Sequence, residues 1–399
     1  MLLARSLRML LGAGLTLFVV GCTPAATLPT PLPSSVPSTP SLPPPPPTTT
    51  PVQNTPAVEA TVRLVIGPPL TDNSGGVEGM AFGPDGRVLA SIYKNGRITL
   101  WDVNTRQTIQ SFTGEGGTGG LGAMTGIAFS PDGKSLVSVS YANGLTITLW
   151  DMPSGQSLDV EKDLSHGEGM TLSPDGKLLA YGKCVELDPW SHCSQYDIIL
   201  WDAATRQPIG HLSGFRVGAP APLGLLFSPD GRMLAVMSSG VTGSGIIQLF
   251  DVTTRQLLTT PLGGEEQFAS MAFSPDGRFM ALGNMAGTIY IWHVESHQVF
   301  SHLIGEKGLV ASVTFSPDGK TLASRILIPS SDYIPKEKIV LWNMDTLQTI
   351  GQPLTGQAAT GSEVGLISMA FSPDSRILAS GTDDGSIILW DLATGYHNP

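Results

Sequence analysis

The chain has 399 residues, a formal net charge of −11 and only 14% charged residues, and its 22 Lys and Arg residues form no cluster. This acidic, dispersed pattern argues against nucleic acid and anionic membrane surfaces as partners, because both are recognised through basic patches. The 47 glycines are typical of a sheet-rich protein with many turns.

The N-terminal segment has the layout of a signal peptide. Arg5 and Arg8 precede an apolar run from Met9 to Val20, which is short for a membrane span. The run ends in Val-Val-Gly-Cys22 and resembles a bacterial lipobox. The resemblance implies lipidation of Cys22 and a chain in the cell envelope, lipid-anchored to a membrane on its extracytoplasmic side. An ordinary signal peptide with a chance cysteine and an uncleaved anchor are the alternatives.

The segment from Thr23 to Pro56 consists mainly of Pro, Thr and Ser without apolar periodicity. It cannot bury a core, so we expect a semi-rigid, largely polyproline spacer. At about 3.1 Å per residue it could reach roughly 100 Å. We therefore divide the chain into a lipoprotein signal peptide (residues 1–21), a lipidated cysteine with a disordered linker (residues 22–56) and a folded domain (residues 57–399).

The folded domain contains a repeat with two signals. One is a Pro-Asp-Gly turn, with Ser375 in place of glycine in the last copy, between an apolar run and an alternating run, as expected between antiparallel strands. The other is an aromatic residue, mostly followed by Asp, at the end of a β-rich run. Both signals occur seven times in alternation, about 48 residues apart, near the roughly 40 to 45 of a four-stranded propeller blade. The turns begin at Gly83, Ser130, Ser173, Ser228, Ser274, Ser316 and Ser372.

From Val62 to the C-terminus these motifs resemble the WD-repeat β-propeller family. The resemblance implies an all-β, seven-bladed β-propeller of four-stranded antiparallel blades. The Gly-His dipeptide of the family is missing from nearly every repeat, so its His–Trp hydrogen-bond tetrad is not transferred. The repeat tryptophans are still expected to pack between blades as apolar anchors. They are Trp101, Trp150, Trp201, Trp292, Trp342 and Trp390.

The two ends of the domain predict how the ring closes. The seventh repeat lacks a fourth strand, because the chain stops soon after Trp390. The segment from Val62 to Thr71 resembles a fourth strand and has no blade of its own. We expect this N-terminal strand to join the last blade beside Ile387–Trp390, which removes an exposed sheet edge.

With Cys22 lipidated, Cys184 and Cys193 remain as a pair in one expected loop, Lys183–Asp197. A disulfide is the favoured interpretation outside the reducing cytoplasm, and it would add about 2 to 3 kcal/mol by restricting the unfolded chain. One alternative is a metal site in which the two cysteines are joined by His192 and by Glu186 or Asp188, although Cys-x8-Cys is not a recognised zinc spacing. Free thiols are the other.

Successive turns of such a meander alternate between the two faces of the disc. The uniform Pro-Asp-Gly turns share one face, which we call the turn face. Connections between second and third strands, and between blades, share the other, which we call the variable face. There the second-to-third connection is short at Lys94–Gly96 but long at Lys183–Asp197 and Arg325–Lys338. Variable loops are where recognition is usually found.

Six side chains on the variable face are the expected partner contacts, because aromatic and Arg residues dominate interface energetics. They are Trp190, Tyr196, Phe215, Arg216, Tyr333 and Lys336. Packing of Trp190 beneath its own loop, and of Tyr333 within its loop, are the alternative interpretations.

No catalytic residue, metal ligand or cofactor is expected. The turn aspartates recur once per repeat, which is typical of a structural residue, and no nucleophile elbow or phosphate loop is present in the sequence. We expect a monomeric, non-catalytic platform for a protein or peptide partner. The alternatives are cell-envelope glycan binding, or a lactonase-like, metal-dependent or small-ligand site at the channel mouth with Glu78, Glu168 and Glu363.

Overall fold

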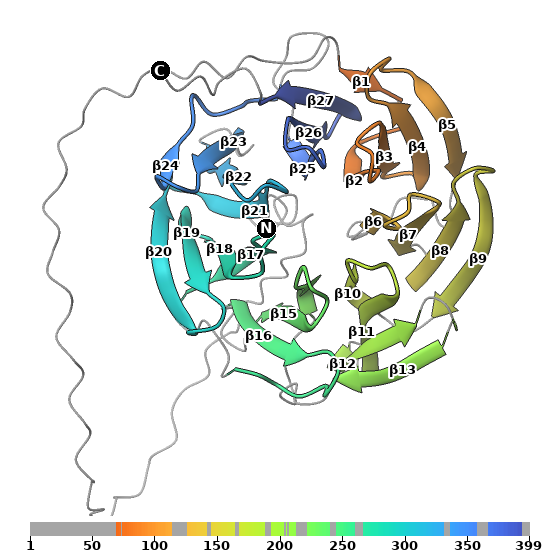
Figure 1. Ribbon diagram of the computed structural model, residues 1–399, viewed down its shortest axis with the longest axis horizontal. Helices are drawn as coiled ribbons and strands as arrows, with labels where there is room; N and C mark the ends of the chain where they lie inside the picture. Colours follow the sequence, from red (N-terminus) through yellow and green to blue (C-terminus); the bar gives the residue numbers. More distant parts are fainter. Residues whose placement is uncertain are drawn as a thin grey trace, which may run out of the picture.

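The computed structural model describes residues 69–72, 74–113, 126–141, 145–163, 167–187, 193–202, 205, 207–212, 222–239, 245–259, 266–330, 336–356 and 366–392. These residues form seven antiparallel β-sheets in a ring (Figure 1). The predicted all-β, seven-bladed propeller is confirmed. The signal peptide, Cys22, the linker and residues 62–68 lie outside the described ranges. Within these ranges no helix has the length and apolar character needed to span a membrane.

The first three blades pair their strands in chain order, with the first strand nearest the ring centre (Figure 1). Blade 1 holds β2 (Val77–Phe82), β3 (Val88–Tyr93), β4 (Arg97–Asp102) and β5 (Thr108–Thr113). Blade 2 holds β6 (Gly126–Phe129), β7 (Ser135–Tyr141), β8 (Leu145–Asp151) and β9 (Gln156–Asp163). Blade 3 holds β10 (Gly167–Leu172), β11 (Leu178–Leu187), β12 (Cys193–Asp202) and β13 (Gln207–Leu212).

The other four blades follow the same plan. Blade 4 holds β14 (Pro222–Phe227), β15 (Met233–Ser239) and β16 (Gly245–Asp251), with a bridge from Phe250 to Leu257 at its outer side. Blade 5 holds β17 (Phe268–Phe273), β18 (Phe279–Asn284), β19 (Thr288–His293) and β20 (Gln298–Ile304). Blade 6 holds β21 (Leu309–Phe315), β22 (Thr321–Ile328), β23 (Lys336–Asn343) and β24 (Gln348–Thr349). Blade 7 holds β25 (Leu366–Phe371), β26 (Ile377–Thr382), β27 (Ser386–Asp391) and β1 (Leu70–Thr71).

The Pro-Asp-Gly turns are fixed by bonds within each turn. In blade 3 the Ser173 hydroxyl donates to the Asp175 carboxylate at 2.6 Å, and the Lys177 N–H donates to the same oxygen at 3.1 Å. The bond from Ser173 is the main cause that lowers the pKa of Asp175. In blade 7 Ser375 replaces the glycine at a φ of 63°, and its hydroxyl accepts the Asp318 N–H of blade 6 at 3.0 Å. The turns therefore connect neighbouring blades as well as neighbouring strands.

The apolar core lies between the blades. Trp101 of blade 1 packs with Ala379 and Leu389 of blade 7, and Trp342 of blade 6 packs with Ala281 and Ile291 of blade 5. Each buried tryptophan therefore joins its blade to the one before it, which is the role expected of an apolar anchor.

Four of the repeat tryptophans also form a hydrogen bond that the spacing of the repeat does not predict. Their indole N–H donates to a buried serine of the second strand at 2.8 to 2.9 Å. The pairs are Trp101–Ser91, Trp150–Ser138, Trp342–Ser324 and Trp390–Ser380. In the other three blades the serine position holds Tyr181, Val236 and Leu282. In these four blades a serine of the neighbouring strand thus satisfies the buried indole N–H.

Both ends of the described chain meet in blade 7. β1 pairs antiparallel with β27, with Leu70 opposite Ile387 and Thr71 opposite Ser386. Leu70 is 3% exposed and packs with Val77 of blade 1. The Ser368 hydroxyl of blade 7 donates to the Val77 carbonyl at 3.2 Å. Leu70 and Thr71, the last two residues of the predicted Val62–Thr71 strand, therefore occupy the outer edge of the last blade, whereas the rest of that prediction lies outside the described residues.

Leu70→Ala should lower the free energy of unfolding by about 2 kcal/mol or more, because it empties a buried position at the junction of blades 7 and 1. Thr71→Ala is the matched control, since Thr71 is exposed on the same strand, and it should change stability by less than about 0.5 kcal/mol. Denaturant midpoints measure both variants. Equal midpoints would contradict a stabilising role for β1.

Candidate interaction surface

The variable face is partly built from strands where the sequence predicted long loops. β11 and β12 continue their ladder through the expected loop Lys183–Asp197, with Cys184 opposite Tyr196 and Leu187 opposite Cys193. β11 has 10 residues whereas β3 has 6, so this hairpin extends the variable face by about 13 Å. The prediction of a loop was wrong here, because alternating residues on both sides of the turn can pair as strands.

The second expected loop, Arg325–Lys338, is also mostly a hairpin. β22 continues to Ile328, which lies opposite Lys336 at the start of β23. The apolar run Ile326-Leu327-Ile328 has the β-propensity that explains this extension. Lys336 is exposed at this hairpin and is available to a partner.

The other predicted contacts have different outcomes. Tyr196 is only 7% exposed, so the prediction that it is a surface contact was wrong; the strand pairing directs its side chain into the protein. Trp190, Phe215, Arg216 and Tyr333 lie outside the described residues, and these predictions stay predictions.

The two predicted disulfide partners stand on neighbouring strands. Cys184 lies in β11 and Cys193 begins β12, three positions from the partner of Cys184 along the ladder. The side chain of Cys193 and residue His192 lie outside the described part of the chain. Among the described residues no three His, Cys, Asp or Glu side chains form a group that could hold a metal ion.

Two of the three glutamates considered for a channel-mouth site lie on innermost strands of different blades (Figure 1). Glu78 lies in β2 and Glu168 lies in β10, which belong to blades 1 and 3. Glu363 falls outside the described ranges.

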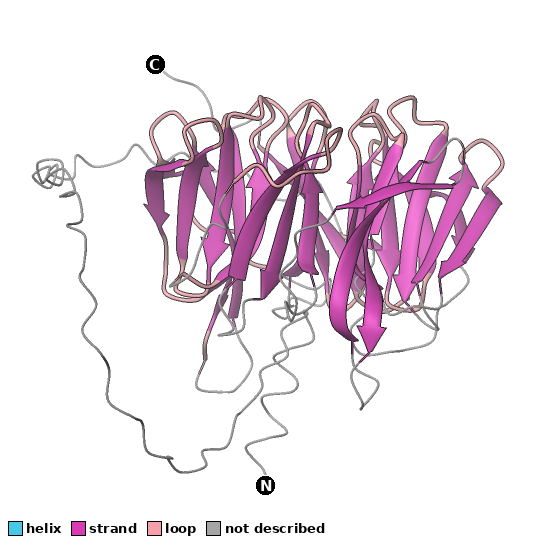
Figure 2. Ribbon diagram, turned by 90° about the horizontal axis from the view of Figure 1, so that it is seen from below, coloured by secondary structure: helices cyan, strands magenta, loops and turns pink. Residues whose placement is uncertain are grey.

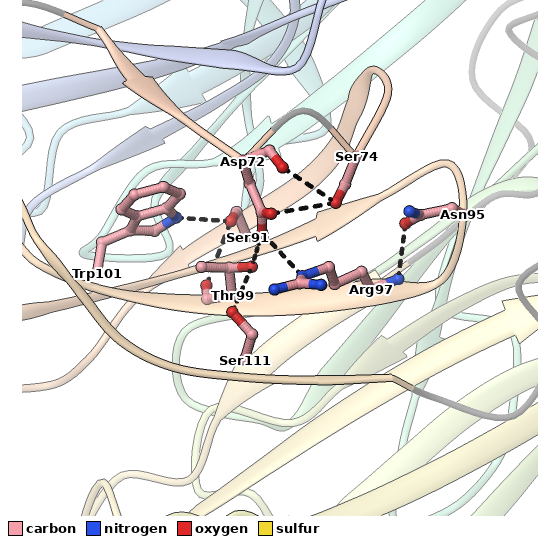
Figure 3. A network of polar contacts seen from close by, with 8 residues as sticks. All are labelled: Asp72, Ser74, Ser91, Asn95, Arg97, Thr99, Trp101 and Ser111. Carbon is pink, nitrogen blue, oxygen red and sulfur yellow. Dashed lines mark hydrogen bonds and ion pairs between the residues drawn. The ribbon is translucent and has the colours of Figure 1, made fainter.

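Asp72 forms the first polar cluster at the variable face, directly after the closing strand β1. Its carboxylate forms an ion pair with Arg97 Nε at 3.1 Å and accepts hydrogen bonds from the Ser74 and Thr99 hydroxyls. The Thr99 carbonyl accepts the Ser91 hydroxyl at 3.2 Å, and Ser91 in turn accepts the indole of Trp101. Figure 3 shows this chain of contacts from the variable face into the blade. Asp72 thus links the chain segment that closes blade 7 to the interior of blade 1.

A second cluster lies in blade 5. The Asn284 side-chain amide donates to the Glu266 carboxylate at 2.9 Å, and hydrogen bonds from Tyr290 and Asn284 lower the pKa of Glu266. Burial, together with Glu266, raises the pKa of Tyr290 to about 12, so its hydroxyl remains a donor. The exposed His302 ring packs edge to face against the Tyr290 ring, with the two ring centroids 4.7 Å apart. This arrangement holds an ionised carboxylate beside two rings and suits recognition of a cationic or hydrogen-bond-donating group.

A third cluster fixes the blade 6 hairpin. Arg325 Nε and Glu337 form an ion pair at 3.3 Å, and both side chains are largely buried. Burial is the main cause that lowers the pKa of Arg325. On the adjacent surface Lys338 Nζ contacts both carboxylate oxygens of Glu306 at 2.9 and 3.0 Å. Register explains why this pair was missed, since Arg325 lies opposite Ile339 and reaches Glu337 only diagonally.

Two family models match parts of the chain. The model described as "WD domain, G-beta repeat" matches residues 106–151, 256–293 and 354–391. The chain contains WD40 repeats. A second model, described as "Anaphase-promoting complex subunit 4 WD40 domain", matches residues 62–119, which include β1 and all four strands of blade 1.

Three relatives illustrate the similarity to curated proteins. Echinoderm microtubule-associated protein-like 2 of Rattus norvegicus is 35% identical over 99 residues, which are 25% of this chain and 14% of that protein. Echinoderm microtubule-associated protein-like 1 of Homo sapiens is 33% identical over 91 residues, 23% and 10% of the two chains. WD repeat-containing protein SL1-17 of Schistosoma mansoni is 31% identical over 182 residues, 43% and 55% of the two chains. The match spans at most about half of each relative.

Arg325→Leu should lower the free energy of unfolding by about 3 to 5 kcal/mol, because it leaves the Glu337 carboxylate buried without its counter-charge. The double variant Arg325→Leu/Glu337→Leu should recover most of that loss. Lys338→Ala, which removes a surface pair on the same strand, should cost no more than about 1 kcal/mol. The ion-pair interpretation would be wrong if the double variant were as unstable as the single one in denaturant unfolding.

Proposed function

We propose that the protein is a non-catalytic platform that binds a protein or peptide partner on its variable face. The observation that carries the proposal is the contrast between the two faces of one repeat protein. The turn face repeats the same bonded turn from blade to blade, whereas the variable face presents hairpins of unequal length and polar clusters that occur once. A partner that contacts several blades can be distinguished only where the blades differ.

The similarity to WD40-repeat proteins supports an interaction role in general terms and does not specify the partner. Two relatives carry microtubule association in their names, but this chain matches at most 14% of their length. A microtubule partner is therefore not part of the proposal. The partner-facing residue that is best placed is Lys336, because it is exposed on the hairpin of blade 6.

A photo-reactive residue in place of Lys336 should capture one discrete protein in cells. Lys134 is the matched control, because it is an exposed lysine on the turn face of blade 2. Mass spectrometry identifies the captured species, and purified partner should then bind Lys336→Glu more weakly than wild type, by about tenfold for a contact worth about 1.4 kcal/mol. Equal capture from both positions would oppose recognition by the variable face.

We further propose that the platform is held at the extracytoplasmic side of a membrane by acyl chains on Cys22. The support is the sequence order of two arginines, an apolar run, Val-Val-Gly-Cys22 and a proline-rich spacer. An oxidising location also agrees with a disulfide between Cys184 and Cys193, which stand on neighbouring strands of one hairpin. In this arrangement the spacer separates the propeller from the membrane.

Cys22→Ala should move the protein from the membrane fraction to the soluble fraction, because acyl chains are the proposed anchor. Cell fractionation followed by immunoblotting measures the change, with Cys184→Ala as the matched cysteine control that stays with membranes. Continued membrane association of Cys22→Ala would contradict lipidation at this residue.

A further inference from the structure

A groove of about 500 Å³ lies at the turn face between blades 5 and 6, away from the variable face. Its sides come from the Pro-Asp-Gly turns of the two blades, and its floor includes Ile291 and Phe315. Figure 2 views the disc from its edge, with the strands running between its two rims. The volume lies within the range of roughly 300 to 1,000 Å³ that is typical of ligand pockets.

Aromatic side chains make this groove different from the other blade junctions. Phe300 is 62% exposed, and its ring lies 5.2 Å from that of Phe279. Phe279 stands opposite His293 at the start of the second strand. The same position holds an aliphatic or hydroxyl residue in the other six blades, namely Val88, Ser135, Leu178, Met233, Thr321 and Ile377. Phe279 itself is half-buried, so the exposed Phe300 ring rests on an aromatic side chain that is anchored in the core, as in a surface built for contact.

Leu347 is a second departure from the repeat at the same groove. Its N–H donates to the Asn343 carbonyl at 2.8 Å, as the Arg106 and Arg255 N–H groups donate to Asp102 and Asp251 in their blades. All three residues have a positive φ, 59° at Leu347, which is unusual for a branched apolar residue. Blade 6 therefore places an apolar side chain beside the groove where blades 1 and 4 place a cation.

The charged residues that line the groove are acidic. Asp276, Asp318 and Asp345 contribute carboxylates, and the described lining residues include no Lys, Arg or His. The nearest repeat cations, Arg278 and Lys320, follow the two turns; Arg278 lies 5.8 Å from the centre of the Phe279 ring. An apolar floor with an acidic rim is complementary to an apolar side chain flanked by positive charge.

From these contacts we propose that the groove binds a peptide segment with a bulky apolar or aromatic side chain between lysines or arginines. The apolar side chain lies against Phe279, Phe300 and Leu347, and the flanking cations face the three aspartates. This site is independent of the variable-face proposal, because it lies on the opposite face and uses none of the same residues.

The probe is a fluorescently labelled synthetic peptide with a central Phe-Leu pair flanked by lysines, titrated with the full chain by fluorescence polarisation. Saturable binding should weaken about tenfold or more in Phe300→Ser and in Asp345→Lys. Ile109→Ser is the matched control, because Ile109 is 53% exposed at the equivalent bulge of blade 1, and it should bind like wild type.

Two further peptides test whether binding requires both the positive charges and the apolar side chains of the probe. Replacing the flanking lysines by glutamates, or the central pair by serines, should abolish binding. Equal affinity for the serine peptide would reduce the interaction to charge alone and overturn the proposal. Unchanged peptide binding by Phe300→Ser would also overturn the proposal. So would a dimer of the wild-type chain that dissociates in Phe300→Ser, because a second copy would then cover the groove.

Discussion

The propeller depends on the pairing between β1 and β27, because a ring of sheets is stable only when its first and last members meet. Two residue pairs make this connection, and Leu70 inserts between blades 7 and 1. Asp72 follows immediately and ties the same segment to Arg97 and Thr99 of blade 1. The junction is thus held on both sides by one short stretch of chain. Every other junction joins blades that are already neighbours in sequence.

The repeat explains why so much of the fold could be predicted. Turn dihedrals and aromatic anchors are local requirements, so the six Pro-Asp-Gly turns, the one Pro-Asp-Ser turn and the seven blade endings mark the strands directly. The loops were harder, because Lys183–Asp197 could be a loop or a longer hairpin, and only register decides. Tyr196 was misplaced for that reason. The clusters around Glu266 and Arg325 join residues from different segments of the chain. The spacing of these residues in the sequence does not predict that they are in contact.

The two faces of the propeller differ in how uniform their connections are. On the turn face, side-chain hydrogen bonds such as that from Ser173 to Asp175 fix the conformation of each turn. A contact with the next blade, such as that between Asp318 and Ser375, restricts the turn further. On the variable face, connections differ in length and carry clusters such as Glu266 with Tyr290. The junction of blades 5 and 6 breaks this division, since Phe279, Phe300 and Leu347 depart from the repeat on the uniform face. In a repeat protein, such local departures are more informative than the shared framework.

The closing strand is also the point at which the chain enters the propeller. Tension applied through the residues before Pro69 therefore reaches the ring at β1, which pairs with β27 over two residue pairs, whereas β5 pairs with β4 over five. The load is carried by an edge strand that the described residues pair over only two positions, rather than by a central strand. A force applied from the N-terminal side of the propeller therefore acts first on the pairing between β1 and β27.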